Sequence, residues 1–295
     1  MRVTDKTLTS NFLLSVNTSR ERIGKLQAQL ASGKRVANPS DDPQAASRIL
    51  RLKAAIAKNE QFQKNVGDGE AMMQQTEHAL DSFADIMVQA KEILTKARSG
   101  SRTIDLGTFA DQIDQLLSSA VEAANTQFNG KYLFGGTQTT SPPFILAPDR
   151  STVTINPNGI TGSIRIPVSD GTTQVINIDG QEAFLGTQIF QALIDVRDSM
   201  RAGNVPTAAQ FDAINSHLNY VSQVGGKAGL ILNSLDLNDR FLSERANQLA
   251  ALLSADEDTD VAQATLQLQQ EQLTLEAALH TGAQLLPKTL MDFLG

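Results

Sequence analysis

The sequence contains no cysteine, no tryptophan and only two tyrosines among its 295 residues. Without cysteine the chain cannot form disulfides, thiolate metal sites or a thiol nucleophile. Because twelve phenylalanines are almost its only aromatic residues, its cores have to be built mainly from Leu, Ile, Val and Ala. This composition is typical of long, packed helices.

The chain also lacks an excess of basic residues, because 25 lysines and arginines face 32 acidic residues and leave a net charge of −7. We therefore expect no nucleic-acid partner, since neutralising phosphates requires a basic surface. No run reaches the roughly 18 apolar residues that a membrane span requires, so no membrane partner is expected. Residues 1–14 lack the pattern of a cleaved secretory signal, and we expect a soluble chain whose export reads no such signal.

The sequence departs from common enzyme and metal-site motifs at specific residues. Each of the three Gly-Lys pairs lacks the glycine that a phosphate-binding loop has five positions earlier, and has Ala28, Asn125 or Val221 there. The three histidines are far apart in the sequence, and none has a second histidine four residues later. A calcium loop starting in the acidic run 256–260 would place Val261 at its glycine position, so we interpret that run as helix capping. We predict no catalytic residues, no cofactor and no metal, and hence no enzyme.

The N-terminal part is predicted to be helical. Apolar residues at three- and four-residue steps predict a first helix that ends near Gly33, where glycine suits a C-terminal cap. Asp42–Pro43 then supplies the N-cap and first residue of a second helix. This helix carries a heptad seam and is expected to reach about Arg98, with Gly67 and Gly69 as candidate interruptions.

The middle of the chain changes character from about residue 129 to 186. Short β-type runs alternate there with turn sequences that contain Pro, Asn, Asp and Gly. The expected strands cover residues 132–134, 153–155, 163–166 and 174–178. Helical periodicity returns at Ile189, breaks at 203–206, and continues in a helix over 211–221 and a longer one over 229–253.

The order of helices, strands and helices predicts a mainly α fold with a small β-rich insert. We expect an elongated molecule with long antiparallel helices, in which the N- and C-terminal helices pair as a coiled coil. The expected domains are a terminal coiled coil (1–42 with 256–295), a helical middle domain (43–136 with 187–255) and a β-rich outer domain (137–186).

The two terminal helices are the candidate assembly surface. Apolar stripes in any helical bundle usually serve the core, but stripes at both extreme ends have few neighbours in the chain and so favour contact with other subunits. The residues proposed for these seams are Leu8, Phe12, Val16, Ile23, Leu26, Leu30, Val261, Ala264, Leu268, Leu275, Ala278 and Leu285.

Three segments of the chain resemble a known family. The segment from Leu26 to Val36, followed by Asn38 to Pro43, is similar to the N-terminal region of the bacterial flagellins and the related hook-filament junction proteins. Asn125 to Gly136 is similar to the same family's passage from helix to hairpin, and Asp260 to Leu294 to its C-terminal helix. The resemblance covers most of the helical framework and leaves out the β-rich insert.

The resemblance implies a structural protein of the bacterial flagellum. Pro43 and the ending Thr289 to Leu294 favour the junction branch over the filament flagellins. That branch implies a ring of several copies between hook-associated protein 1 and flagellin, after unfolded export through the flagellar type III channel to the extracellular flagellum. It also implies an export chaperone bound to the C-terminal helix.

Two alternatives are open at this point. The first is a short flagellin that forms the filament itself. The second is a secreted adhesin or effector that acts through residues 137–186.

Overall fold

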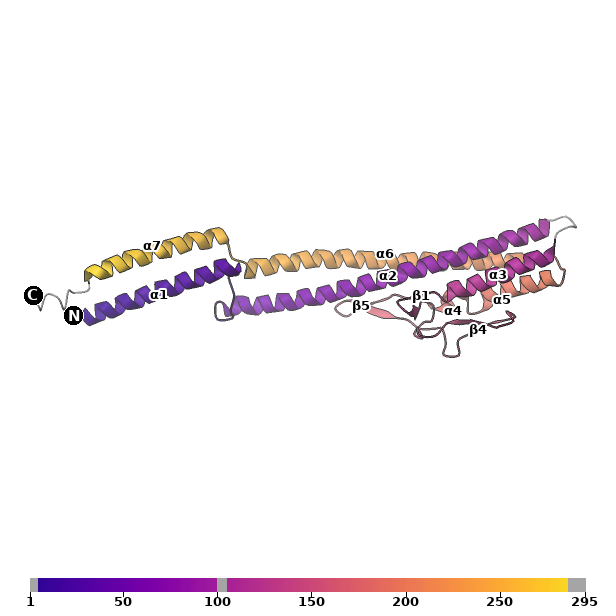
Figure 1. Cartoon of the computed structure of the whole chain (residues 1–295), viewed down its shortest axis with the longest axis horizontal. Coiled ribbons are helices and arrows are strands. Elements are labelled where there is room, and N and C mark those ends of the chain that lie inside the picture. Colours follow the sequence, from indigo (N-terminus) through magenta and orange to yellow (C-terminus); the bar gives the residue numbers. More distant parts are fainter. Residues whose placement is uncertain (1–4, 100–104, 286–295) are drawn as a thin grey trace, which may run out of the picture. The chain divides into compact units, whose positions relative to one another are not determined.

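In the computed structural model of the protein, the described residues are 5–99 and 105–285. They form long helices and six short strands (Figure 1). The chain divides into two compact units, of which the first comprises residues 1–58 with 245–295 and the second residues 59–244. The predicted fold class, mainly α with a small β-rich insert, is confirmed.

The longest helix is α2 (Pro43–Ser99), and the sequence predicts both of its ends closely. The Asp42 carboxylate accepts a hydrogen bond from the Ala45 amide at 3.0 Å, as expected of an N-cap. The helix continues through the two candidate interruptions. Gly69 is buried, and a Cβ there would lie 2.9 Å from the Ile166 side chain, so this glycine permits close packing and does not end the helix.

The second long helix, α6 (Ala208–Glu257), corrects the prediction of two separate helices. Gly225 and Gly226 lie inside it, although each glycine costs a helix about 1 kcal/mol relative to alanine. Val224 and Ala228 on either side are buried in the core. Tertiary packing of this face therefore overrides the local preference for a break.

Three shorter helices belong to the second unit. α3 (Leu106–Ala124) starts at the N-cap Asp105 and packs against α5 (Gln188–Arg201). α4 (Gly180–Phe184) is a single short turn capped by Asp179, and the sequence reading missed it.

The strands form three separate antiparallel pairs. Their bounds are β1 (Gln127–Phe128) with β2 (Lys131–Tyr132), β3 (Phe144–Leu146) with β4 (Val153–Ile155), and β5 (Arg165–Ser169) with β6 (Thr172–Val175). Asn129 and Gly130 have φ values of 49° and 74° in the turn of the first hairpin, as its tight connection requires. Prediction found β4 with its bounds, shifted β2, β5 and β6, and missed β1 and β3.

The core of the second unit contains five fully buried phenylalanines. They are Phe83, Phe134, Phe144, Phe184 and Phe190. The Phe184 ring centroid lies 4.7 Å from that of Phe83 and 4.8 Å from that of Phe134. Residues of the predicted outer domain, 137–186, therefore share one core with helices α2 and α5. The division into three domains stays a prediction beside the two units that the structure forms.

The first unit contains the terminal helices, α1 (Asp5–Ser32) and α7 (Val261–Leu285). Gly33 follows α1 with a φ of 71°, which confirms the expected glycine cap. Asp260 caps α7, because its carboxylate accepts a hydrogen bond from the Gln263 amide at 3.0 Å. A small apolar cluster of Val36, Ala45, Ala46 and Ile49, with Leu253 against it, completes the unit.

Candidate assembly surface of the terminal helices

α1 and α7 pack side by side as an antiparallel pair within the first unit (Figure 1). The Phe12 ring lies against the backbone of Gly282, where a Cβ would overlap it. Arg22 Nη1 pairs with Glu271 Oε1 at 3.2 Å. Phe12 and Arg22 are ten residues apart while Gly282 and Glu271 are eleven apart, so both contacts belong to one antiparallel register.

The predicted seam residues lie along this pair, with different degrees of burial. Val16 and Ala264 are buried, and Val261 is exposed. The half-buried ones are Phe12, Ile23, Leu26, Leu30, Leu268, Leu275 and Ala278. The side chains of Leu8 and Leu285 lie outside the described residues. The role of all these seam residues in contacts between subunits stays a prediction.

The outer faces of both helices carry leucines that the sequence reading missed. Leu14 is 69% exposed, Leu266 67% and Leu273 66%. Each is two residues away from at least one residue of the inner stripe, which corresponds to about 200° around a helix. The sequence signal for these leucines is a second set of apolar residues, out of phase with the inner stripe. Each terminal helix thus has apolar side chains on two opposite faces, and the intrachain pair covers one of them.

The connections that join the terminal helices to α2 and α6 lie against each other. The Thr259 amide donates to the Gly33 carbonyl at 2.9 Å, and the Arg35 amide donates to the Glu257 carbonyl at 2.7 Å. Lys34 and Asp258 form an antiparallel β-bridge between them. The two chain segments therefore pair as a short antiparallel crossing, held by these backbone hydrogen bonds.

Five charged side chains, Lys34, Arg48, Lys53, Asp256 and Glu257, form what we call the ionic clasp at this crossing. The Glu257 side chain is 8% exposed, and its carboxylate pairs with Lys34 Nζ at 2.6 Å and with Lys53 Nζ at 3.0 Å. Arg48 pairs with Asp256 through two nitrogens, the shortest distance being 2.7 Å. The hydrogen bond from Lys34 is the main reason that the pKa of Glu257 lies below its ordinary value. The acidic run interpreted as helix capping therefore has two roles, since only Asp260 caps α7.

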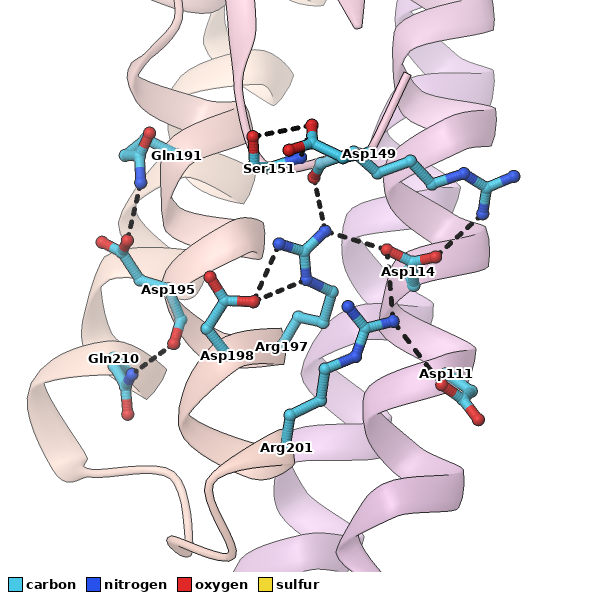
Figure 2. Close-up of polar contacts among 11 residues, drawn as sticks. Asp111, Asp114, Asp149, Ser151, Gln191, Asp195, Arg197, Asp198, Arg201 and Gln210 are labelled. Atoms are coloured by element: carbon cyan, nitrogen blue, oxygen red, sulfur yellow. Dashed lines mark hydrogen bonds and ion pairs between the residues drawn. The ribbon is translucent and has the colours of Figure 1, made fainter. Parts of the chain in front are cut away.

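The second unit contains a separate charge network (Figure 2). The Arg197 guanidinium, 3% exposed, donates to Asp114 at 2.8 Å and to the Arg150 carbonyl at 2.6 Å, and pairs with Asp198 at 2.8 Å. Arg150 binds the other Asp114 oxygen at 2.8 Å. These contacts tie the turn between β3 and β4 to helices α3 and α5. The carboxylates and guanidiniums face one another, so the network connects these segments through ion pairs.

Helix α6 carries a further apolar stripe in the second unit. Leu230, Leu237 and Phe241 are 71%, 57% and 58% exposed and follow one another at steps of seven and four residues. These steps place all three on one helix face.

Among the described residues, 5–99 and 105–285, no helix is long and apolar enough to cross a membrane. Within the same residues, no group of three or more His, Cys, Asp or Glu side chains is placed to hold a metal. A groove of about 470 Å³ lies between α1 and α7, and it is lined by Arg22, Glu271, Leu26 and polar neighbours.

Residues 3–139 match the bacterial flagellin N-terminal helical region. Flagellar hook-associated protein 3 from Salmonella typhimurium is 27% identical over 280 residues, covering 83% of this chain and 84% of that protein. A flagellin from Bacillus subtilis is 25% identical over 272 residues, covering 89% of this chain and 88% of that protein.

Solved structures agree on the fold. A flagellar hook-associated protein from Vibrio parahaemolyticus aligns with a TM-score of 0.65 at 22% identity, covering 74% of this chain and all of that one. Flagellar hook-associated protein 3 from Legionella pneumophila aligns with a TM-score of 0.60 at 15% identity, covering 70% of this chain and 98% of that one. The chain thus has the bacterial flagellin N-terminal helical region over residues 3–139 and is similar to hook-associated protein 3 along most of its length.

Proposed function

We propose that this protein is the structural subunit that joins the flagellar hook to the flagellin filament, the role of hook-associated protein 3. The observation that carries the proposal is the double apolar character of the terminal helices. Leu14, Leu266 and Leu273 lie on faces that the α1 and α7 pair does not cover. Exposed apolar residues in such a row favour contact with further subunits.

Assembly then follows from burial of these outer faces. Burying one leucine side chain stabilises a contact by about 1.5–3 kcal/mol. In a ring every copy repeats the same contact, so the gain is multiplied by the number of subunits. The copies of this chain in the ring contact hook-associated protein 1 on one side and flagellin on the other.

Before assembly the same leucines need protection. An export chaperone with an apolar groove suits α7, because helix-in-groove binding uses anchors on one helix face at steps of three, four and seven residues. Leu266 and Leu273 are seven residues apart on the outer face, and Leu279 is also exposed. In this proposal the chain passes unfolded through the flagellar type III channel and functions in the extracellular flagellum.

The proposed role is structural and not catalytic. The relatives named above are flagellar hook-associated proteins and flagellins. The two charged clusters, the ionic clasp and the Arg197 network, both connect chain segments through ion pairs. This arrangement supports a scaffold.

A short flagellin is the second candidate, because the Bacillus subtilis flagellin is similar over nearly all of this chain. Adding purified protein to flagellin seeds separates the two. A filament flagellin elongates the seeds indefinitely without other subunits, whereas a junction protein does not.

A secreted adhesin that acts through residues 137–186 is less well supported. Phe144 and Phe184 belong to the common aromatic core, so this segment is built as part of the second unit. Transplanting it onto another scaffold is expected to transfer no binding activity.

A deletion strain tests the proposed junction role. Loss of the protein is expected to leave hooks without filaments and to release flagellin into the medium, and a plasmid copy is expected to restore filaments. Electron microscopy of hooks and immunoblots of the medium provide the measurement. Normal filaments in the deletion strain contradict the proposal.

A further inference from the structure

We propose that the ionic clasp is the register lock of the terminal helix pair, with the buried Glu257 carboxylate as its central positioning group. This deepens the proposed function and rests on it in one respect, because the register decides which leucines lie on the outer face.

The apolar seam alone does not define one register. Val16, Ile23 and Leu30 in α1 follow one another at seven-residue steps, and so do Val261, Leu268 and Leu275 in α7. A slip of one heptad, roughly 10 Å along the helix, therefore exchanges one apolar residue for another. Coiled coils with such repeats depend on polar or charged residues to select a register.

The chain connections also permit a slip. α1 ends at Ser32 and α2 begins at Pro43, so ten residues, 33–42, join them. A connection of this length can span up to about 33 Å when extended, which exceeds a one-heptad displacement severalfold. Chain connectivity therefore does not prevent α1 from moving along α7.

Two features resist that movement along the helix pair itself. The Phe12 ring needs the missing side chain of Gly282, and a slip of one heptad in one direction places Phe12 opposite Leu275. The Arg22 and Glu271 pair adds little, because the Arg22 side chain is 64% exposed and exposed pairs contribute at most about 1 kcal/mol. A slip in the other direction moves Phe12 toward residue 289, outside the described residues, so the contact of Phe12 with Gly282 defines the register from one side.

The clasp opposes the slip in both directions. Glu257 at the end of α6 binds Lys34, two residues after the end of α1, and Lys53 in α2. Moving α1 by one heptad removes Lys34 from Glu257 and breaks the bonds from Thr259 to Gly33 and from Arg35 to Glu257. A buried carboxylate that loses one of its two ammonium partners, together with two backbone hydrogen bonds beside it, is less stable, so the clasped register is selected.

The absence of cysteine makes this testable with introduced disulfides in the full-length protein. The register set by Phe12 with Gly282 and by Lys34 with Asp258 places Leu26 opposite Leu268. The double variant Leu26→Cys with Leu268→Cys therefore reports the native register. Leu26→Cys with Leu275→Cys, and Leu26→Cys with Val261→Cys, report slips of one heptad in either direction.

Dilute monomer is oxidised mildly, and the intrachain disulfide is measured on non-reducing gels. With the clasp intact, only the native reporter is expected to form its disulfide efficiently. Adding Glu257→Gln is expected to raise disulfide formation in at least one slipped reporter about tenfold and to lower it in the native one. Glu276→Gln changes an exposed glutamate of α7; it is the matched control and is expected to change neither.

Charge reversal separates pairing from any other effect of the substitution. The triple variant Glu257→Lys, Lys34→Glu and Lys53→Glu restores opposite charges at the three positions and is expected to restore the native disulfide. An unchanged reporter pattern in Glu257→Gln overturns the proposal. So does a loss of disulfide from all three reporters, which indicates fraying, or a failure of the charge-reversed variant to recover.

Filament attachment in cells tests the link to function separately. Glu257→Gln is expected to reduce the number of attached filaments while the protein is still exported. If the reporters shift but the deletion strain has normal filaments, the proposed function fails and the register lock stands. If the reporters do not shift but Glu257→Gln abolishes filaments, the register lock is wrong and the junction role stands.

Discussion

The two units of this protein bury their apolar residues in different ways. In the second unit, five phenylalanines are fully buried and contact one another across α2, α4, α5 and the β-rich segment. In the terminal helices of the first unit, the described apolar seam residues are mostly half-buried, and Leu14, Leu266 and Leu273 are exposed. The aromatic core of the second unit is thus covered within the chain, whereas the terminal pair leaves leucines exposed, which we propose are covered by other subunits.

This difference predicts different responses to mutation, and the aromatic core gives the largest. Phe184→Ala is expected to destabilise the second unit by about 3–5 kcal/mol, because the site contacts four other rings and cannot collapse without disturbing them. Urea unfolding followed by circular dichroism measures the change. Phe241→Ala, at a 58% exposed position, is the control and is expected to stay within about 0.5 kcal/mol.

The Arg197 network gives the next largest effect. Arg197→Ala removes the buried partner of the Asp114 carboxylate, leaves the exposed Arg150 as its close partner, and is expected to cost about 3 kcal/mol. Combining Arg197→Met with Asp114→Asn removes both charges and is expected to recover part of the loss. If the single and double variants unfold at the same urea concentration, the pairing of Arg197 with Asp114 contributes nothing to the stability of the second unit.

The same network makes the second unit sensitive to acid. Burial of Asp114 opposes its ionisation, but the hydrogen bonds from Arg150 and Arg197 outweigh it and hold its pKa below the ordinary 3.8. Its contribution is therefore complete above 3.8 and is lost as the pH falls through the lower folded-state pKa. Asp114→Asn is expected to flatten the fall in stability at acid pH, measured by unfolding between pH 5 and about 2. A fall as steep as in the wild type contradicts this assignment.

The helical framework could be predicted because its signals are local. Gly33, Asp42 and Pro43 mark helix ends, and the three- and four-residue steps mark faces, so α1, α2 and α7 were found with bounds within a few residues. The continuity of α6 could not be predicted, since buried Val224 and Ala228 compensate for two central glycines through contacts with residues distant in the sequence. Strands of two or three residues, such as β1 and β3, carry too few residues for a period.

The candidate site was predictable in part for the same reason. A repeat shows which residues share a helix face but not which face a partner covers. The inner seam therefore appeared in the sequence, while the outer leucines and the ionic clasp needed the register of α1 against α7. Glu257 was read as part of a cap because its partners Lys34 and Lys53 are more than 200 residues away.

The smallest expected effect on the monomer tests the outer face. Leu266→Asp with Leu273→Asp changes two exposed positions, so the unfolding free energy of either unit is expected to change by no more than about 0.5 kcal/mol. The matched variant Leu268→Asp with Leu275→Asp places two carboxylates in the half-buried seam. Separation of α1 from α7 is expected there, because burying an unpaired carboxylate is costly, with the second unit unchanged in cooperative melting.

In cells both double variants are expected to lose filaments while the protein is still made, for different reasons. The seam variant lacks the terminal pair, and the outer-face variant has the pair but puts charges where the next subunit is proposed to bury leucines. Circular dichroism of the purified monomers separates the two causes, because only the seam variant is expected to lose helical signal. Normal filaments in the outer-face variant, with none in the seam variant, mean that the pair is needed but its outer leucines are not a contact. The terminal helices would then act in assembly through the α1 and α7 seam itself.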